Sequence, residues 1–293
     1  MNWHFARTVG LPKFFLRQLL LRLHNFFARQ PLRIRLPTGL SMNLPEDSFF
    51  GRDVYVTNAD VDWGSEALFS RHLDLQGDFI DVGANIGYYS VYVAPVVRRV
   101  FSFDPDPRNR APLAASSRES GNIFVQERAL SSSSGEMKLE LGDESSVSRL
   151  ATNQDRSDGK TIKVPVTSLD EFVRSQGDMR VTGIKLDTEG HELPILQGGI
   201  EMIRRDQPLI LTELMRWPGH GDEAFRELVE FAEALAYHLF AFVPQPLGWV
   251  RAGRFRLVAL DDGKTFSTNA TKMIFLVPER LHSKFVRELS ETC

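Results

Sequence analysis

The residues best suited to chemistry are carboxylates that lie at the ends of short apolar runs. Asp81 lies near the end of the run in Phe79–Ser90 (FIDVGANIGYYS), and Asp104 ends the next run, 100–103. Both runs are typical of buried parallel strands. Ligands of open α/β sheets bind outside the carboxyl ends of such strands, where an acidic residue about 20 residues after a glycine turn is placed to bind ribose hydroxyls. We therefore expect Asp104 to bind the ribose of a nucleoside-bearing cofactor.

The turn after the first strand indicates which cofactor. Gly83 lets the backbone turn sharply and a ligand approach without meeting a Cβ atom, and Gly87 is expected where the next helix lies close to the sheet. A dinucleotide site would have glycine where Asn85 stands, because the backbone there approaches a diphosphate. The pattern instead suits S-adenosylmethionine, which has an amino-acid tail. We expect this turn, including Ala84, to bind that cofactor, with Asp81 facing its ammonium through a water or a backbone amide.

A third polar group follows the apolar run 181–186. Asp187 stands at its tip, and we expect it beside the cofactor's sulfur, where it would orient the acceptor, take up a proton or bind a divalent metal such as magnesium. Glu189 and His191 are further catalytic candidates. Glu189 could equally be a favourable charge in the first turn of the following helix, and His191 could be a surface histidine. Lys185 is interpreted as a salt-bridge partner.

The elements that must position these residues alternate between strands and helices. The predicted strands are 79–82, 100–104, 122–126, 181–186, 208–211 and 239–243, and a closing hairpin is predicted from 254–260 and 273–277. Residues 45–64 read as an irregular lead-in and 142–160 as a polar loop, long enough to be a lid. This order predicts a Rossmann-like α/β fold with a mostly parallel, seven-stranded sheet and helices on both faces.

The N-terminal segment has an unusual charge. Its first 45 residues contain seven Lys or Arg residues and no acidic residue. A helix is predicted over Lys13–Arg29, with one apolar face made of Phe15, Leu16, Leu19, Leu20, Leu23, Phe26 and Phe27. This face either packs on the rest of the chain or lies on an anionic membrane surface. We expect an extension over residues 1–60, a cofactor-binding domain over 61–280 and a C-terminal tail over 281–293.

Composition sets wider limits. The 293-residue chain has a net charge of −3, and its single cysteine, Cys293, excludes a disulfide framework and a thiolate metal cluster. This favours a reducing, cytoplasmic location, with peripheral contact to a membrane as an option. No apolar run reaches the roughly 18 residues needed to span a bilayer.

Four blocks together resemble the FkbM-type family of S-adenosylmethionine-dependent methyltransferases. They are Phe79–Ser90, Phe103–Pro107, Val166–Phe172 and Ile184–Gly199. The resemblance implies a class I methyltransferase fold and methyl transfer, usually to oxygen, on a small-molecule, sugar or glycan acceptor, with no nucleic-acid partner. Asp104-Pro105-Asp106 departs from the family's more frequent Glu-Pro-Asn.

Two other interpretations stay open. A nicotinamide-dependent oxidoreductase is disfavoured by Asn85 and by the missing Tyr-x-x-x-Lys. A non-catalytic nucleoside-binding module would use its basic N-terminus as a tether.

Overall fold

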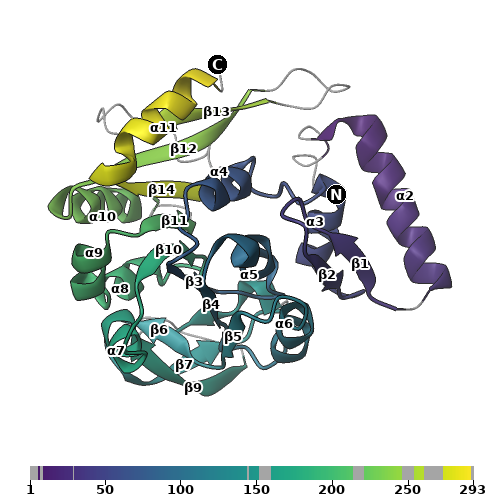
Figure 1. Cartoon of the computed structure of the whole chain (residues 1–293). Coiled ribbons are helices and arrows are strands. Elements are labelled where there is room, and N and C mark those ends of the chain that lie inside the picture. The colour runs from purple at the N-terminus through teal and green to yellow at the C-terminus, as the bar shows by residue number, and fades with distance from the viewer. Residues whose placement is uncertain are drawn as a thin grey trace.

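The computed structural model describes residues 6, 9–28, 30–143, 145–151, 160–213, 221–245, 254–260 and 273–291. At its centre is an eight-stranded sheet with the order β13-β12-β14-β11-β10-β3-β4-β5 (Figure 1). Its strands are β3 Asp78–Val82, β4 Arg99–Phe103, β5 Ile123–Gln126, β10 Val181–Leu186, β11 Leu209–Glu213, β12 Tyr237–Gln245, β13 Arg254–Ala259 and β14 Met273–Pro278. The five strands from β5 to β11 are parallel to one another, and β14 is antiparallel to both its neighbours.

This sheet confirms the predicted Rossmann-like α/β fold, with one strand more than the seven expected. The predicted hairpin between 254–260 and 273–277 is wrong, because β12 lies between β13 and β14 and pairs with both. Strand β13, predicted as 254–260, is at the edge of the sheet beyond β12.

Helices cover both faces of the sheet because successive strand residues point to opposite sides and both sides are apolar. In β3, Phe79 belongs to one core and Ile80 to the other. The first core is closed by α4 Ser65–Arg71, α5 Tyr88–Val93 with the 3-10 turn η1 Ala94–Val96, and α11 Glu279–Glu291. The second is closed by α7 Leu169–Ser175, α8 Glu192–Gln197, α9 Ile200–Asp206 and α10 Gly221–Ala234. Helix α6 Arg110–Ser117 packs beside α5.

The chain passes from β3 outward to β4 and β5, then returns to add β10 and β11 on the other side of β3. The boundary between β3 and β10 is therefore the point where the strand order reverses. Ligands of open α/β sheets bind at this point, outside the carboxyl ends of the strands.

A second sheet with the order β6-β9-β7-β8 lies below the main one in Figure 1. It comprises β6 Ala129–Ser131, β7 Gly135–Glu140, β8 Arg149–Leu150 and β9 Thr161–Ser168. The predicted loop 142–160 is thus partly ordered structure, with the 3-10 turn η2 Ser145–Val147 and strand β8. Its residues 144 and 152–159 lie outside the described residues.

The N-terminal part consists of α2 Leu11–Phe27, the antiparallel hairpin of β1 Leu32–Arg35 and β2 Ser41–Leu44, and α3 Phe49–Thr57. Helix α3 corrects the expected irregular lead-in. It begins because the hydroxyl of Ser48 accepts a hydrogen bond from the amide of Gly51 at 2.9 Å, as an N-cap residue does. Residues 281–291 of the predicted C-terminal tail lie in α11, whose Leu281 and Phe285 are buried in the core. No described helix is long and apolar enough to cross a membrane.

Candidate active site

A cavity of about 290 Å³ opens at the carboxyl ends of β3, β4, β10 and β11. Of the predicted site residues, it is lined by Gly83, Ala84, Asn85, Asp104, Asp187 and Glu189. The sequence therefore placed most of its candidates at one site. Three others, Asp81, Gly87 and His191, do not line the cavity, and each has another environment.

The glycine turn folds against the end of β4. The amides of Gly83 and Ala84 both donate to the carbonyl oxygen of Phe103, each at 3.0 Å. Asn85 has a φ of +50°, in the left-handed region that asparagine tolerates better than most residues. Its amide donates to Oδ2 of Asp104 at 2.8 Å. The turn and the predicted ribose-binding carboxylate are thus held as one unit.

Asp104 is nearly buried and faces the cavity. Besides the amide of Asn85, its carboxylate accepts from the side-chain amide of Asn109 at 3.0 Å and from the amide of Asp106 at 3.0 Å. Burial raises the pKa of Asp104 to about 6, although these hydrogen bonds oppose the shift. The carboxylate is therefore ionised at neutral pH and can still accept hydrogen bonds from a ligand.

Gly83 makes the sharp turn that the sequence predicts, with a φ of +73°, and it meets a second constraint as well. A Cβ atom there would overlap the carbonyl oxygen of Asp187 and lie 2.9 Å from its carbonyl carbon. The neighbour is thus the chain at the end of β10. Gly87 likewise meets helix α6 instead of the sheet, since its Cβ would lie 2.9 Å from Cδ1 of Leu113.

Asp81 lies behind the cavity wall and is fully buried. Its carboxylate accepts from the hydroxyl of Ser90 at 2.6 Å and lies 3.9 Å from Nζ of Lys185. Asp81 therefore does not face the cavity as predicted. Its negative charge stabilises the protonated form of Lys185.

Lys185 lines the cavity and is the salt-bridge partner that the sequence predicted. Its Nζ lies 3.1 Å from Oδ2 of Asp187 and donates to the carbonyl oxygen of Gly83 at 3.1 Å. Burial by itself lowers the pKa of Lys185, but the charges of Asp187 and Asp81 outweigh burial and hold the pKa above its usual value. Lys185 is therefore a fixed cation that orients Asp187.

Next to Lys185 is a cluster of three carboxylates. Oxygens of Asp187, Glu189 and Glu213 lie within 4.8 Å of one another, and all three residues line the cavity. The charge of Asp187, together with burial, raises the pKa of Glu213 well above its usual value. Burial and the charges of Asp187 and Glu192 raise the pKa of Glu189 to about 7. This cluster thus contains a carboxyl that can exchange a proton near neutral pH.

Glu189 and Glu192 have different environments. Glu189 has a φ of +58° and lines the cavity, so it is more than a favourable first-turn charge. Glu192 begins α8, and its carboxylate accepts from the amide of Thr188 at 2.7 Å and from its hydroxyl at 2.9 Å. Glu192 therefore has the structural role expected of an acidic residue at a helix start.

His191 is neither on the helix surface nor in the cavity. It is buried, and its Nε2 lies 2.8 Å from the hydroxyl of Ser131 in β6. Burial lowers its pKa, so the imidazole is neutral at neutral pH. We expect it to join α8 to the small sheet.

Oxygen ligands such as those of the cluster suit Mg²⁺. The positive charge of Lys185, 3.1 Å from Asp187, already offsets part of the cluster's negative charge. Magnesium binding by Asp187 stays a prediction.

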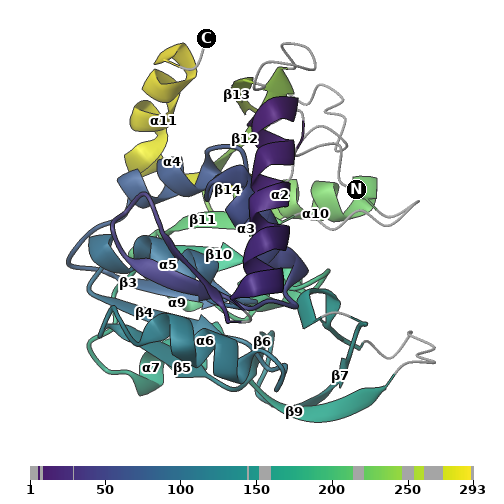
Figure 2. The same cartoon turned by 90° about the vertical axis from the view of Figure 1, so that its right-hand side faces the viewer.

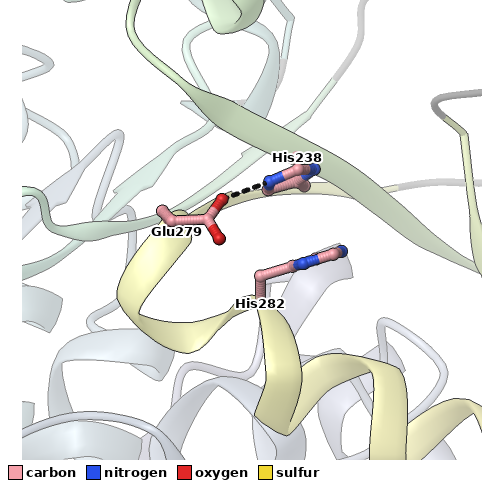
Figure 3. A group of neighbouring side chains, drawn as sticks. All are labelled: His238, Glu279 and His282. Atoms are coloured by element: carbon pink, nitrogen blue, oxygen red, sulfur yellow. Dashed lines mark hydrogen bonds and ion pairs between the residues drawn. The ribbon is translucent and has the colours of Figure 1, made fainter.

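A second group, His238, Glu279 and His282, is outside the cavity and joins β12 to α11 (Figure 3). Nε2 of His238 lies 2.8 Å from Glu279, and the two imidazole rings stack with centroids 3.8 Å apart and planes 14° apart. A metal ion lies near the plane of each ring that binds it, and two stacked rings offer no such common point. We interpret this group as a structural contact.

The sequence did not predict every acidic residue of the cavity wall. Asp62 also lines the cavity and accepts from the hydroxyl of Tyr89 at 2.8 Å. It precedes β3 in a segment read as irregular, where no local pattern marks it. The sequence predicts Glu213 close to Asp187, because it follows the neighbouring strand, and it does line the cavity.

The described wall is strongly acidic. Asp53 and Asp106 pair with arginines outside it, Arg52 at 3.8 Å and Arg108 at 2.8 Å. Among the described lining residues Lys185 is the single Lys or Arg, facing the carboxylates of Asp53, Asp62, Asp104, Asp106, Asp187, Glu189 and Glu213.

Comparison with known proteins agrees with this arrangement. The family model of the methyltransferase FkbM domain matches residues 81–239. The chain belongs to this family. The match covers the glycine turn, Asp104 and the carboxylate cluster, and it favours the methyltransferase prediction over both alternatives.

A curated relative, the hexuronic acid methyltransferase AglP of Haloferax volcanii, is 33% identical over 119 residues, which are 40% of this chain and 48% of the relative. The matched region thus spans about half of that protein. A solved methyltransferase FkbM from Methylobacillus flagellatus has 14% identity and a TM-score of 0.42, over 77% of this chain and 52% of its own. The tRNA (uracil-54, C5)-methyltransferase of Pyrococcus abyssi, solved with S-adenosyl-L-homocysteine, has 13% identity and a TM-score of 0.40, over 78% and 44%.

Proposed function

We propose that this FkbM-family protein transfers the methyl group of S-adenosylmethionine to a hydroxyl oxygen of a sugar or glycan. The observation that carries the proposal is the cavity itself, which has Asp104 at the end of β4 and the proton-exchanging carboxylate cluster at the ends of β10 and β11.

The charge of the wall supports this choice of cofactor. S-adenosylmethionine carries a positive sulfonium and an ammonium, and both are stabilised by nearby carboxylates. A nicotinamide dinucleotide would bring a negatively charged diphosphate to the same wall, where Lys185 is the single described cation. Like charges in a partly buried site cost several kcal/mol, so the wall disfavours that cofactor.

Asp104 and the adjoining turn form the proposed nucleoside side of the site. The ribose hydroxyls would donate to the carboxylate of Asp104, which the amides of Asn85 and Asp106 already hold in place. Such hydrogen bonds to a charged group contribute about 1.5–3 kcal/mol each.

The carboxylate cluster forms the proposed acceptor side. A hydroxyl becomes a better nucleophile when a base takes its proton, and a base works best when its pKa lies near the operating pH. Glu189, with a pKa of about 7, meets this condition. Asp187 is held by Lys185 at 3.1 Å, which suits it to orient the acceptor. We therefore assign proton uptake to Glu189 and orientation to Asp187.

The acceptor class rests on chemistry and on the relative. The related protein is a hexuronic acid methyltransferase, and a hexuronic acid offers both hydroxyl and carboxylate oxygens. The cluster would repel a carboxylate next to Glu189, whereas a neutral hydroxyl can donate to it. This favours formation of a methyl ether over a methyl ester.

The test is methyl transfer from labelled S-adenosylmethionine to neutral and uronic-acid-containing oligosaccharides, with Glu189→Gln as the control variant. We expect labelled product that mild alkali does not release, and little product with the variant. Transfer to none of these acceptors would contradict the proposed acceptor class. Label released by alkali would identify an ester and contradict hydroxyl methylation.

A further inference from the structure

Helix α2 has an exposed apolar face. Seven large apolar side chains on it are between 44% and 76% exposed: Phe15, Leu16, Leu19, Leu20, Leu23, Phe26 and Phe27. At 100° per residue they form one continuous stripe about 140° wide. Soluble proteins rarely expose a contiguous apolar surface of this kind unless it binds something.

The opposite face of the same helix is attached to the protein. Phe14 is buried in the core, and Arg17 donates to the carbonyl oxygen of Tyr55 and, at 2.7 Å, to Oδ1 of Asn58. Helix α2 packs along α3. Seen from the side in Figure 2, it lies in front of the rest of the described molecule. The helix is therefore fixed in place by the face opposite the stripe, and the stripe stays exposed among the described residues.

The charges around the stripe indicate its partner. Lys13 and Arg22 are exposed and flank it on opposite sides, and the chain has no acidic residue before Glu46. A second copy of the chain docking stripe to stripe would bring like charges together. An anionic lipid surface offers both an apolar interior for the stripe and negative headgroups for its flanks.

We propose that α2 is a membrane-docking helix that lies in the surface of an anionic bilayer, with the seven-residue stripe inserted between headgroups and acyl chains. The two flanking cations contact the lipid headgroups. This surface is separate from the cavity, so the proposal stands apart from the identity of the methyl acceptor.

The experiment is sedimentation of the full chain with vesicles of phosphatidylcholine alone or mixed with phosphatidylglycerol. We expect binding to the anionic vesicles that weakens as salt rises from about 0.05 to 0.5 M, because salt screens the charges. The variant Lys13→Gln/Arg22→Gln should bind them about 30-fold more weakly, since each cation near an anionic leaflet contributes about fivefold.

The apolar contribution is tested with a matched pair of double variants. Leu19→Glu/Leu23→Glu changes side chains that are 54% and 44% exposed, and Leu75→Glu/Val286→Glu changes side chains elsewhere that are 61% and 45% exposed. The first should bind anionic vesicles at least about 100-fold more weakly, through lost apolar burial and added repulsion. The second carries the same added charge and should lose no more than a few-fold. Circular dichroism and the melting temperature show whether each variant is folded.

Failure of the wild-type chain to bind anionic vesicles would overturn the proposal. So would equal losses in the two double variants. A dimer in analytical ultracentrifugation that Leu19→Glu/Leu23→Glu dissociates, with no vesicle binding, would assign the stripe to a second copy.

Discussion

Gly83→Ala should destabilise the protein more than Gly121→Ala, although both glycines have nearly the same backbone conformation, with φ of +73° and +72°. Alanine at such a φ costs about 1–2 kcal/mol because its Cβ approaches the following carbonyl oxygen. At Gly121 the new Cβ would meet nothing within 4 Å. At Gly83 it would overlap the carbonyl oxygen of Asp187 and lie 2.9 Å from its carbonyl carbon. Either the glycine turn or the segment at Asp187 must then move, and overpacking costs a further ~1–3 kcal/mol.

We therefore expect the free energy of unfolding to fall by about 1–2 kcal/mol for Gly121→Ala and by about 2–5 kcal/mol for Gly83→Ala. Urea denaturation measures both values. Because Gly83 and Asp187 line the same cavity, Gly83→Ala should also weaken S-adenosylhomocysteine binding more than about tenfold in calorimetry. Gly121→Ala should leave that binding unchanged. Equal losses of stability, with normal ligand binding by both variants, would refute the close packing of the glycine turn against Asp187.

Three further predictions concern the carboxylates. Asp104→Ala should weaken S-adenosylhomocysteine binding about tenfold to several hundredfold in calorimetry, and it should lower the melting temperature, because the amides of Asn85 and Asn109 lose their acceptor. Asp187→Asn should lower turnover at least ~100-fold with cofactor binding retained, and activity that chelation removes and magnesium restores would identify the carboxylate as a metal ligand. The wild-type rate should rise with pH through about 7 as Glu189 loses its proton, and Glu189→Gln should lack this rise in a pH–rate profile.

The sequence was informative where a local pattern has one physical cause. Short apolar runs that end in a carboxylate predicted β3, β4 and β10, and the reversal of strand order then brought Asp104 and Asp187 to one cavity. The same reasoning predicts Glu213 close to Asp187, since neighbouring parallel strands end at the same edge.

Contacts between segments that lie far apart in the sequence could not be predicted from such local patterns. Gly83 faces the peptide of Asp187, and the burial of His191 depends on Ser131 in another sheet. Neither partner is marked by spacing in the sequence. The position of Asp81 in β3 predicts a carboxylate that faces a ligand. In the structure it instead lies 3.9 Å from Nζ of Lys185, behind the cavity wall.

The N-terminal helix shows a second limit of local patterns. Its apolar periodicity was read correctly as a helix, but periodicity does not tell whether the apolar face is buried. In α2 the side that packs carries Phe14 and the anchored Arg17, and the more apolar stripe faces outward.

The central claim is that the acidic cavity binds the methyl donor S-adenosylmethionine and not a nicotinamide dinucleotide. The most direct test is calorimetric titration of the full chain with S-adenosylhomocysteine and, in parallel, with NADH. The account predicts saturable binding of S-adenosylhomocysteine at one site and no detectable binding of NADH. Binding of NADH with no binding of S-adenosylhomocysteine would contradict it.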